Sequence, residues 1–138
     1  MTFDDVVDVL DRTDVVAVVT TRQSGAPIAT PIWSMVVDGV PYLRSAFGES
    51  SWWYRHVLAG RPVGFAMGDG ALAERDRDAA LELPREPVKA EYVPADDPVQ
   101  ERIDAVIRSK YGQPGDPSVD AMLSDVARAC TLRIDAPA

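Results

Sequence analysis

The sequence predicts an α+β fold, rich in β-structure, in which about six or seven short antiparallel strands form a barrel with helices at its periphery. Three observations support this prediction: β-branched runs of strand length, turn signals between them, and helical patterns at the start, middle and end of the chain. The 138 residues are enough for one domain with a modest core, and no repeat or linker divides residues 1–138.

The first part of the chain predicts one helix followed by three strands. Thr2 to Asp11 places its apolar residues on one helical face, and Thr2 with Asp5 resembles a capping box. A turn at 22–26 and the hairpin dipeptide Asp38-Gly39 separate the strands that follow. These strands are expected at Val15–Thr21, Pro27–Val37 and Val40–Ser45.

A short aromatic helix is predicted to begin near Ser50 or Ser51. Gly60 suits the position just after a helix, and Pro62 prevents its continuation. A fourth strand follows at Val63–Met67.

The second half contains one segment with conflicting signals. Residues 71–83 are rich in helix formers but lack a 3.6-residue period, so we expect a strand that continues from a hairpin at Gly68–Gly70. The remaining signals are clearer. They predict a strand at Val88–Val93, a helix opened by Asp97-Pro98 and closed by Gly112, a helix capped by Ser118 with Val119, Met122, Leu123 and Val126 inward, and a last strand at Thr131–Ile134.

Composition limits the classes of partner. The net charge of −8 argues against nucleic acid and anionic membranes, because both require a basic surface. The longest apolar runs fall short of the roughly 18–20 residues that span a bilayer, and no secretory signal is visible. The single Cys130 permits no internal disulfide and is expected to be a buried core thiol. We therefore expect a soluble, cytoplasmic protein.

Arg44 and Ser45 end the third strand just before the aromatic helix. Together with Ser50, Ser51 and the free N–H groups of the helix start, they suggest a clamp for a phosphate group. Arg55 and Arg61 follow closely in the sequence. The alternative is structural: an arginine that meets Asp38 or solvent, and a serine that only caps a helix.

Aromatic residues could cover a flat ring system. Trp52, Trp53 and Tyr54 are consecutive, so they cannot share one helical face, and the rings that do not pack on the barrel are free to face a ligand or a partner subunit. Trp33, next to Thr30 and Pro31, is a second candidate for lining a flat ligand. A core tryptophan is the alternative for Trp33.

Other reactive residues form no recognisable catalytic motif. His56 is the only histidine, without cysteine or carboxylate neighbours at zinc-ligand spacing, and is interpreted as a surface or interface residue. The acidic residues of 74–82 alternate with Arg75 and Arg77 and are interpreted as a solvated face. Lys110 suits a helix C-terminus, or alternatively folds over the ligand. A site without a catalytic dyad fits hydride transfer, in which the cofactor performs the chemistry, and it fits a binding protein equally well.

These residues suggest a family. The segment Asp14–Pro62, with Ala29-Thr-Pro-Ile-Trp33, Leu43-Arg-Ser45 and Gly48-x-x-x-Trp52-Trp-Tyr-Arg-His-Val-Leu-Ala-Gly-Arg-Pro-Val63, resembles the flavin-binding split-barrel superfamily. That superfamily includes the pyridoxamine-phosphate-oxidase-like proteins and the actinobacterial deazaflavin-dependent nitroreductases. His56 stands where the deazaflavin branch has Asn, and Ser51 stands where it has Pro.

The resemblance implies a homodimer of split β-barrels that holds FMN or a deazaflavin coenzyme in a groove between subunits. By this resemblance Arg44, Ser45, Ser50 and Ser51 would bind the phosphate, Thr30, Pro31 and Trp33 would lie along the ring system, and Trp53 and Arg55 would flank it.

Three functional hypotheses remain. The first is an oxidoreductase that delivers hydride from the reduced cofactor to a small organic acceptor. The second is a non-catalytic protein that carries or senses a flavin, haem or other flat ligand. The third is an interaction module without a ligand.

Overall fold

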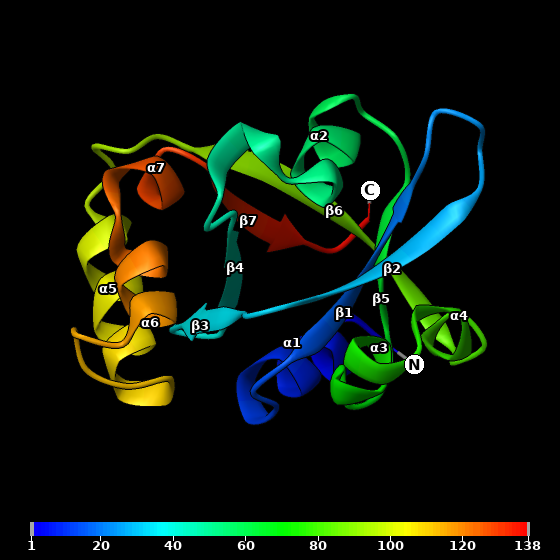
Figure 1. The fold of residues 1–138 in the computed structure, drawn as a ribbon, viewed down its shortest axis with the longest axis horizontal. Helices are drawn as coiled ribbons and strands as arrows, with labels where there is room; N and C mark the ends of the chain where they lie inside the picture. Colours follow the sequence, from blue (N-terminus) through cyan, green and yellow to red (C-terminus); the bar gives the residue numbers. More distant parts are fainter. Residues whose placement is uncertain (1, 138) are drawn as a thin grey trace.

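A computed structural model describes residues 2–137 and shows seven strands in one antiparallel sheet that curls into a half-barrel (Figure 1). The strand order is β2-β1-β5-β6-β7-β4-β3. The strands are β1 (Val16–Thr21), β2 (Pro27–Ile32), β3 (Met35–Val37), β4 (Val40–Arg44), β5 (Val63–Ala66), β6 (Arg85–Val93) and β7 (Thr131–Asp135). The predicted β-rich α+β class is confirmed.

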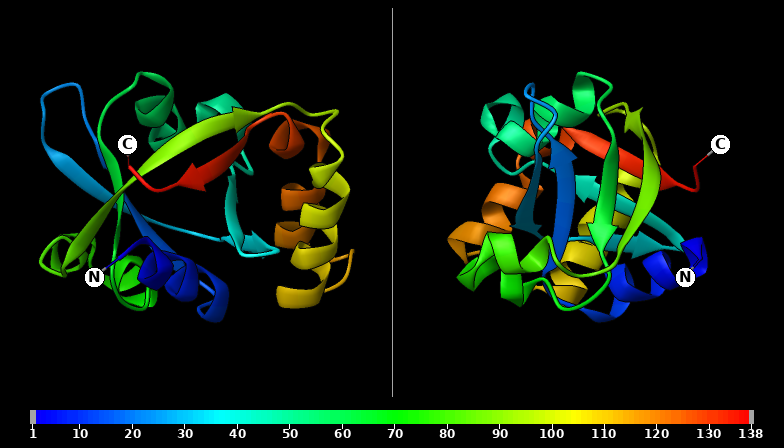
Figure 2. Two further views of the ribbon diagram at one scale, coloured as in Figure 1. Left: turned by 180° about the vertical axis from the view of Figure 1, so that it is seen from behind. Right: turned by 90° about the vertical axis from the view of Figure 1, so that its right-hand side faces the viewer.

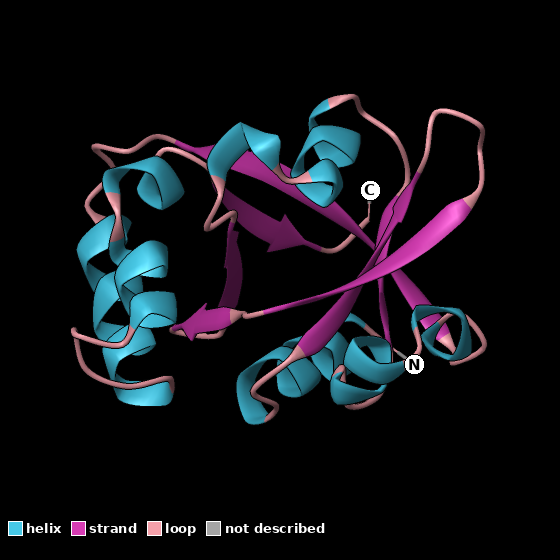
Figure 3. Cartoon of the chain, in the orientation of Figure 1, coloured by secondary structure: helices cyan, strands magenta, loops and turns pink. Residues whose placement is uncertain are grey.

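The helices surround the sheet and leave the strands at the centre (Figure 3). They are α1 (Phe3–Arg12), the 3-10 helix η1 (Gly48–Ser50), α2 (Trp52–Leu58), α3 (Ala71–Arg75), α4 (Arg77–Ala80), α5 (Val99–Lys110), α6 (Pro117–Leu123) and α7 (Asp125–Arg128). In Figure 1, α5, α6 and α7 gather at one end of the molecule. Helices α1 and α2 lie apart in this view but pack against the same main core, whereas α3 and α4 cover the outer face of β1.

The long strand β6 gives the sheet its curl. Its first half pairs with β5, where Val63 lies opposite Val88, and its second half pairs with β7, where Val93 lies opposite Thr131. Figure 2 shows it running diagonally from one end of the molecule to the other. One strand thus serves both parts of the half-barrel.

Strand β1 is buried on both faces, as the alternation of its side chains requires. Val16 and Val18 face the main core with Leu10 and Phe65, whereas the outer face belongs to a separate cluster of small residues. That cluster contains Ala17, Val19, Ala29, Ala66, Ala73 and Ala80. The small side chains let α3 and α4 approach the sheet closely.

The strand expected over residues 71–83 is wrong, because α3 and α4 occupy this segment. Asp76 separates the two helices: its carboxylate accepts the N–H of Ala79 at 3.1 Å and so caps α4. Ala73 and Ala80 face the sheet and the charged residues face outward, a pattern too short to show a helical period.

The single strand expected over Pro27–Val37 is divided between β2 and β3. The break occurs at Ser34, whose hydroxyl donates to the carbonyl of Leu10 at 2.8 Å and whose N–H donates to the hydroxyl of Tyr111 at 3.0 Å. At the break, backbone groups that would pair with a neighbouring strand in a continuous β-sheet instead form hydrogen bonds with side chains and loops.

The helix expected after Ser118 is also divided. Asp116 caps α6, and Ser124 accepts the N–H of Ala127 at 3.2 Å to cap α7. Val126, expected to face inward, is 56% exposed. Within residues 2–137, every helix is too short or too polar to cross a bilayer.

Candidate functional site

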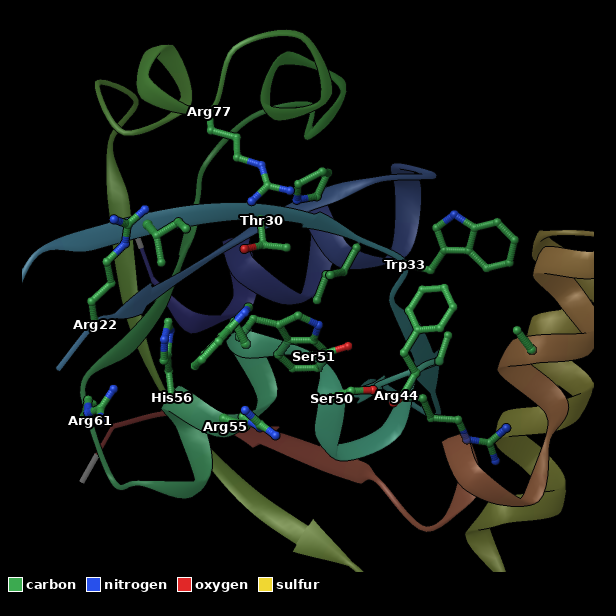
Figure 4. A pocket seen from close by; sticks show the side chains of 18 of the residues that line it. Arg22, Thr30, Trp33, Arg44, Ser50, Ser51, Arg55, His56, Arg61 and Arg77 are labelled. Atoms are coloured by element: carbon green, nitrogen blue, oxygen red, sulfur yellow. Dashed lines mark hydrogen bonds between the residues drawn. The ribbon is translucent and has the colours of Figure 1, made fainter.

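A groove of about 1330 Å³ lies between β2 on one side and η1 with α2 on the other. Figure 4 shows β2 carrying Thr30 across from α2, which carries Arg55 and His56. All of the predicted site residues except Ser45 line this groove; they are Thr30, Pro31, Trp33, Arg44, Ser50, Ser51, Trp53 and Arg55. The structure therefore brings together residues from separate parts of the sequence.

Arg44 is the most deeply buried charged residue of the site, at 2% exposure. Its Nη1 donates to the carboxylate of Asp104 at 2.6 Å, and its Nη2 donates to the side-chain oxygen of Gln100 at 2.7 Å. In Figure 4 its side chain points away from the other arginines. Both terminal nitrogens are bound inside the protein, so the geometry gives Arg44 a structural role in place of the expected phosphate clamp.

The three predicted serines differ in availability. Ser45 is buried and donates to the carbonyl of Gly48 at 2.6 Å, and Ser50 donates to the carbonyl of Phe47 at 2.5 Å. Ser51 precedes α2, as predicted, but its hydroxyl has no hydrogen bond within residues 2–137. Of the three, Ser51 is the one whose hydroxyl the protein leaves free to meet a ligand.

Trp33 stacks on Tyr111 with a centroid distance of 4.0 Å and an interplanar angle of 2°. The Tyr111 hydroxyl lies 2.7 Å from the carbonyl of Asp14 and accepts the N–H of Ser34. Burial raises the pKa of Tyr111 to about 12, so this hydroxyl stays neutral at physiological pH. Trp33 is thereby held as a rigid aromatic wall of the groove.

Lys110 binds the backbone next to the Trp33–Tyr111 stack. Its ammonium group donates to the carbonyls of Leu10 at 2.8 Å and Ser34 at 3.0 Å. Desolvation lowers its pKa. The ammonium group of Lys110 therefore binds backbone carbonyls of the fold. Lys110 is not among the residues that line the groove.

Four arginines form what we call the cationic cluster of the groove: Arg22, Arg55, Arg61 and Arg77. None of them makes an ion pair with a carboxylate of the described chain. Within residues 2–137, only backbone carbonyls accept hydrogen bonds from them: the carbonyl of Glu49 from Arg55 at 2.6 Å, and that of Thr21 from Arg61 at 3.3 Å. In a chain of net charge −8, four unpaired guanidinium groups around one groove create a local site for anions.

His56 is not the surface residue that one of its two interpretations expected, because it is 7% exposed and lines the groove. Its alternative role at an interface stays a prediction. Its Nδ1 lies 2.9 Å from the hydroxyl of Thr20 on β1. Burial, followed by the charges of Arg61 and Arg22, lowers the pKa of its imidazole. The imidazole is thus neutral at physiological pH.

Sequence reasoning missed Arg22, Arg77 and Tyr111 as parts of the site. Arg22 lies in a turn and Arg77 in a mixed-charge segment, where isolated arginines are ordinary surface residues. No local pattern distinguishes them, since only the fold of β1, β2 and α4 carries them to the groove.

No family model and no curated protein matches the sequence, but solved structures match the fold. The haem storage protein HutZ from Vibrio cholerae matches with a TM-score of 0.63 and 13% identity, over 97% of this chain and 89% of HutZ. The conserved hypothetical protein Rv2991 from Mycobacterium tuberculosis matches with a TM-score of 0.58 and 19% identity, over 100% of this chain and 81% of Rv2991.

A candidate pyridoxamine 5′-phosphate oxidase from Listeria innocua matches with a TM-score of 0.55 and 16% identity, over 95% of this chain and 88% of its own. These similarities agree with the strand order and the half-barrel described above. The chain therefore has the split-barrel fold of the pyridoxamine-phosphate-oxidase-like proteins.

Proposed function

We propose that this protein binds a phosphorylated, planar redox cofactor, FMN or a deazaflavin coenzyme, and uses it to reduce a small organic acceptor. The observation that carries this proposal is the composition of the groove, in which Trp33, backed by its stack on Tyr111, and the unpaired cationic cluster line one cavity. Its volume of about 1330 Å³ exceeds the roughly 300–1,000 Å³ of ordinary small-molecule pockets, so a ring system and its phosphate tail fit together.

Different residues of the groove are suited to different parts of the ligand. Trp33 presents a flat apolar surface to the ring system, and Trp53 flanks the groove from α2. The hydroxyls of Thr30 and Ser51 have no hydrogen-bond partner within residues 2–137 and can bind polar edges of the ligand. The cationic cluster binds the phosphate, which assigns to other arginines the role first predicted for Arg44.

The bound cofactor supplies the hydride, and the protein supplies orientation and charge. Arg55 illustrates this, since its guanidinium lies 5.1 Å from the centre of the Trp52 ring and remains within the groove. A cation in this position stabilises negative charge that forms on the cofactor or acceptor.

A titration with FMN and with the deazaflavin coenzyme tests binding. Trp33, Trp52 and Trp53 all line the groove, so quenching of their fluorescence reports occupancy directly. We expect a micromolar or tighter dissociation constant for one cofactor. Arg61→Gln should weaken it about tenfold or more, since a charge-assisted hydrogen bond contributes roughly 1.5–3 kcal/mol.

The matched control is Arg108→Gln, an exposed arginine on α5 that is not part of the groove. It should bind the cofactor like the unmodified protein. Binding of neither cofactor would refute the proposal and favour an interaction module.

A non-catalytic carrier of a flat ligand is the second candidate. Its support is the similarity of the fold to that of HutZ, a haem storage protein. Steady-state turnover separates the two functions. A cofactor that binds but reduces no quinone, nitro compound or oxygen would favour the carrier, and haem titration followed by absorbance would then identify its ligand.

We further propose that the chain is one domain and acts as a cytoplasmic homodimer. Phe47 and Trp52 are 75% and 68% exposed beside the groove, which is unusual for large apolar side chains and typical of an interface. Trp52→Ser should shift the sedimentation coefficient towards the monomer. A protein that sediments as a monomer before the change would contradict the dimer.

A further inference from the structure

His56 lies near the cations Arg22 and Arg61, and no carboxylate of residues 2–137 pairs with it. Its imidazole is more than nine-tenths buried and lines the groove. The groups around it are the Thr20 hydroxyl on β1, the Trp52 ring on its own helix with a centroid distance of 6.3 Å, and the guanidinium groups of Arg22 and Arg61.

The two ring nitrogens of His56 are in different situations. Nδ1 is bound to Thr20, whereas Nε2 has no hydrogen-bond partner within residues 2–137. The Thr20 hydroxyl is buried and can rotate to donate to a neutral Nδ1 or to accept from a protonated one. The partner of Nδ1 therefore tolerates both charge states, and only Nε2 is left for a ligand.

We propose that Nε2 of His56 binds the anionic group of the ligand together with Arg22 and Arg61, and that binding of this group is coupled to uptake of a proton by the imidazole. This role rests on the proposed function, because it assigns the phosphate of the ligand to one part of the groove. It also adds a property, pH-dependent affinity, that the cationic cluster alone does not provide.

The coupling follows from charge balance. In the free protein, burial and the two arginines disfavour the imidazolium form and lower the pKa of His56 below its ordinary value of 6.5. An oxyanion between the guanidinium groups offsets their charge and accepts a hydrogen bond from Nε2–H, so it favours the protonated ring. Binding therefore raises the pKa of His56, and by linkage the affinity for the anion rises as the pH falls through that pKa.

The experiment uses the fact that His56 is the only histidine of the chain. Protein labelled with ¹⁵N in the imidazole is titrated between pH 4.5 and 8.5 by about half-unit steps, in sodium sulfate and in sodium chloride of equal ionic strength. Sulfate is the probe because it imitates a phosphate group and stays a dianion over this range.

We expect a lower pKa in chloride and a higher pKa in sulfate. Each unit of difference corresponds to about tenfold tighter binding of sulfate by the protonated protein. Arg22→Gln and Arg61→Gln should reduce the difference, and Arg108→Gln should preserve it. His56→Gln, which offers an uncharged amide donor, should bind sulfate with an affinity that does not change with pH.

An identical pKa in sulfate and chloride would overturn the proposal, whether sulfate fails to bind or binds elsewhere. The outcome is separable from the cofactor titration. A pKa unaffected by sulfate in a protein that binds FMN would refute the role of His56 and leave the proposed function intact. A sulfate-dependent pKa in a protein that binds neither cofactor would support the anion site and refute the choice of cofactor.

Discussion

At the scale of the residue, Arg44 lines the groove, but its hydrogen bonds are made inside the protein. Its guanidinium joins β4 to α5 through Asp104 and Gln100, and it donates to the carbonyl of Met122 on α6 at 3.1 Å. Asp104 also pairs with Arg128 on α7 at 2.5 Å. The network ties the helical end of the molecule to the sheet that forms the groove.

Arg44→Met should lower the free energy of unfolding by about 3–5 kcal/mol, because it leaves the nearly buried Asp104 with a single partner. Arg102→Met is the matched control, since its pair with Asp38 is exposed and should contribute only about 0–1 kcal/mol. Urea unfolding of both variants measures the difference. Equal losses would show that the Arg44 network does not stabilise the fold.

At the scale of the element, the end of α5 determines the orientation of Trp33. Tyr111 caps this helix, stacks on Trp33 and binds the backbone of the β2–β3 break. Tyr111 thus links the end of α5, the break between β2 and β3, and the ring of Trp33, although Ser34 and Tyr111 are about 80 positions apart in the sequence.

Two substitutions at Tyr111 separate these contributions. Tyr111→Phe keeps the stack but leaves the buried Ser34 N–H without its partner, and should cost about 1–3 kcal/mol of stability with little change in FMN affinity. Tyr111→Leu removes the stack as well and should also weaken FMN binding. Denaturant unfolding and tryptophan quenching provide the two readouts. Equal FMN affinity in both variants would show that the stack does not orient Trp33 for a ligand.

At the scale of the whole molecule, the groove is positively charged although the chain as a whole is acidic. The chain has 22 acidic and 14 basic residues, yet four unpaired arginines line a single groove. The groove lining contains no carboxylate among the described residues, whereas the chain as a whole is acidic. The net negative charge disfavours large polyanions, while the local positive charge favours a small anion.

Affinity for FMN should therefore fall as sodium chloride is raised from about 0.05 to 0.5 M, since salt screens the attraction between exposed charges. The Arg61→Gln protein should show a shallower dependence than the Arg108→Gln control. Fluorescence titrations at constant pH measure both slopes. A salt-independent dissociation constant would mean that the cationic cluster does not bind the phosphate.

Much of the fold follows from the sequence alone. The β-branched run of β1, the Asp38-Gly39 turn with φ values of 50° and 79°, and the Ser51 start and Gly60 end of α2 depend on local rules that need no tertiary information. Eight residues of the predicted site, some proposed from local patterns and others implied by the family resemblance, line one groove.

The tertiary structure decided which side chains remain free. Arg44 and Arg61 are chemically identical in the sequence, but the packing of α5 against β4 supplies Arg44 with Asp104, whereas no carboxylate of residues 2–137 pairs with Arg61. His56 and Arg77 likewise acquire their positions from β1 and α4. Local sequence determines where a residue sits along its element; its free hydrogen bonds and charge depend on neighbours that are distant in the chain and meet only when the sheet curls.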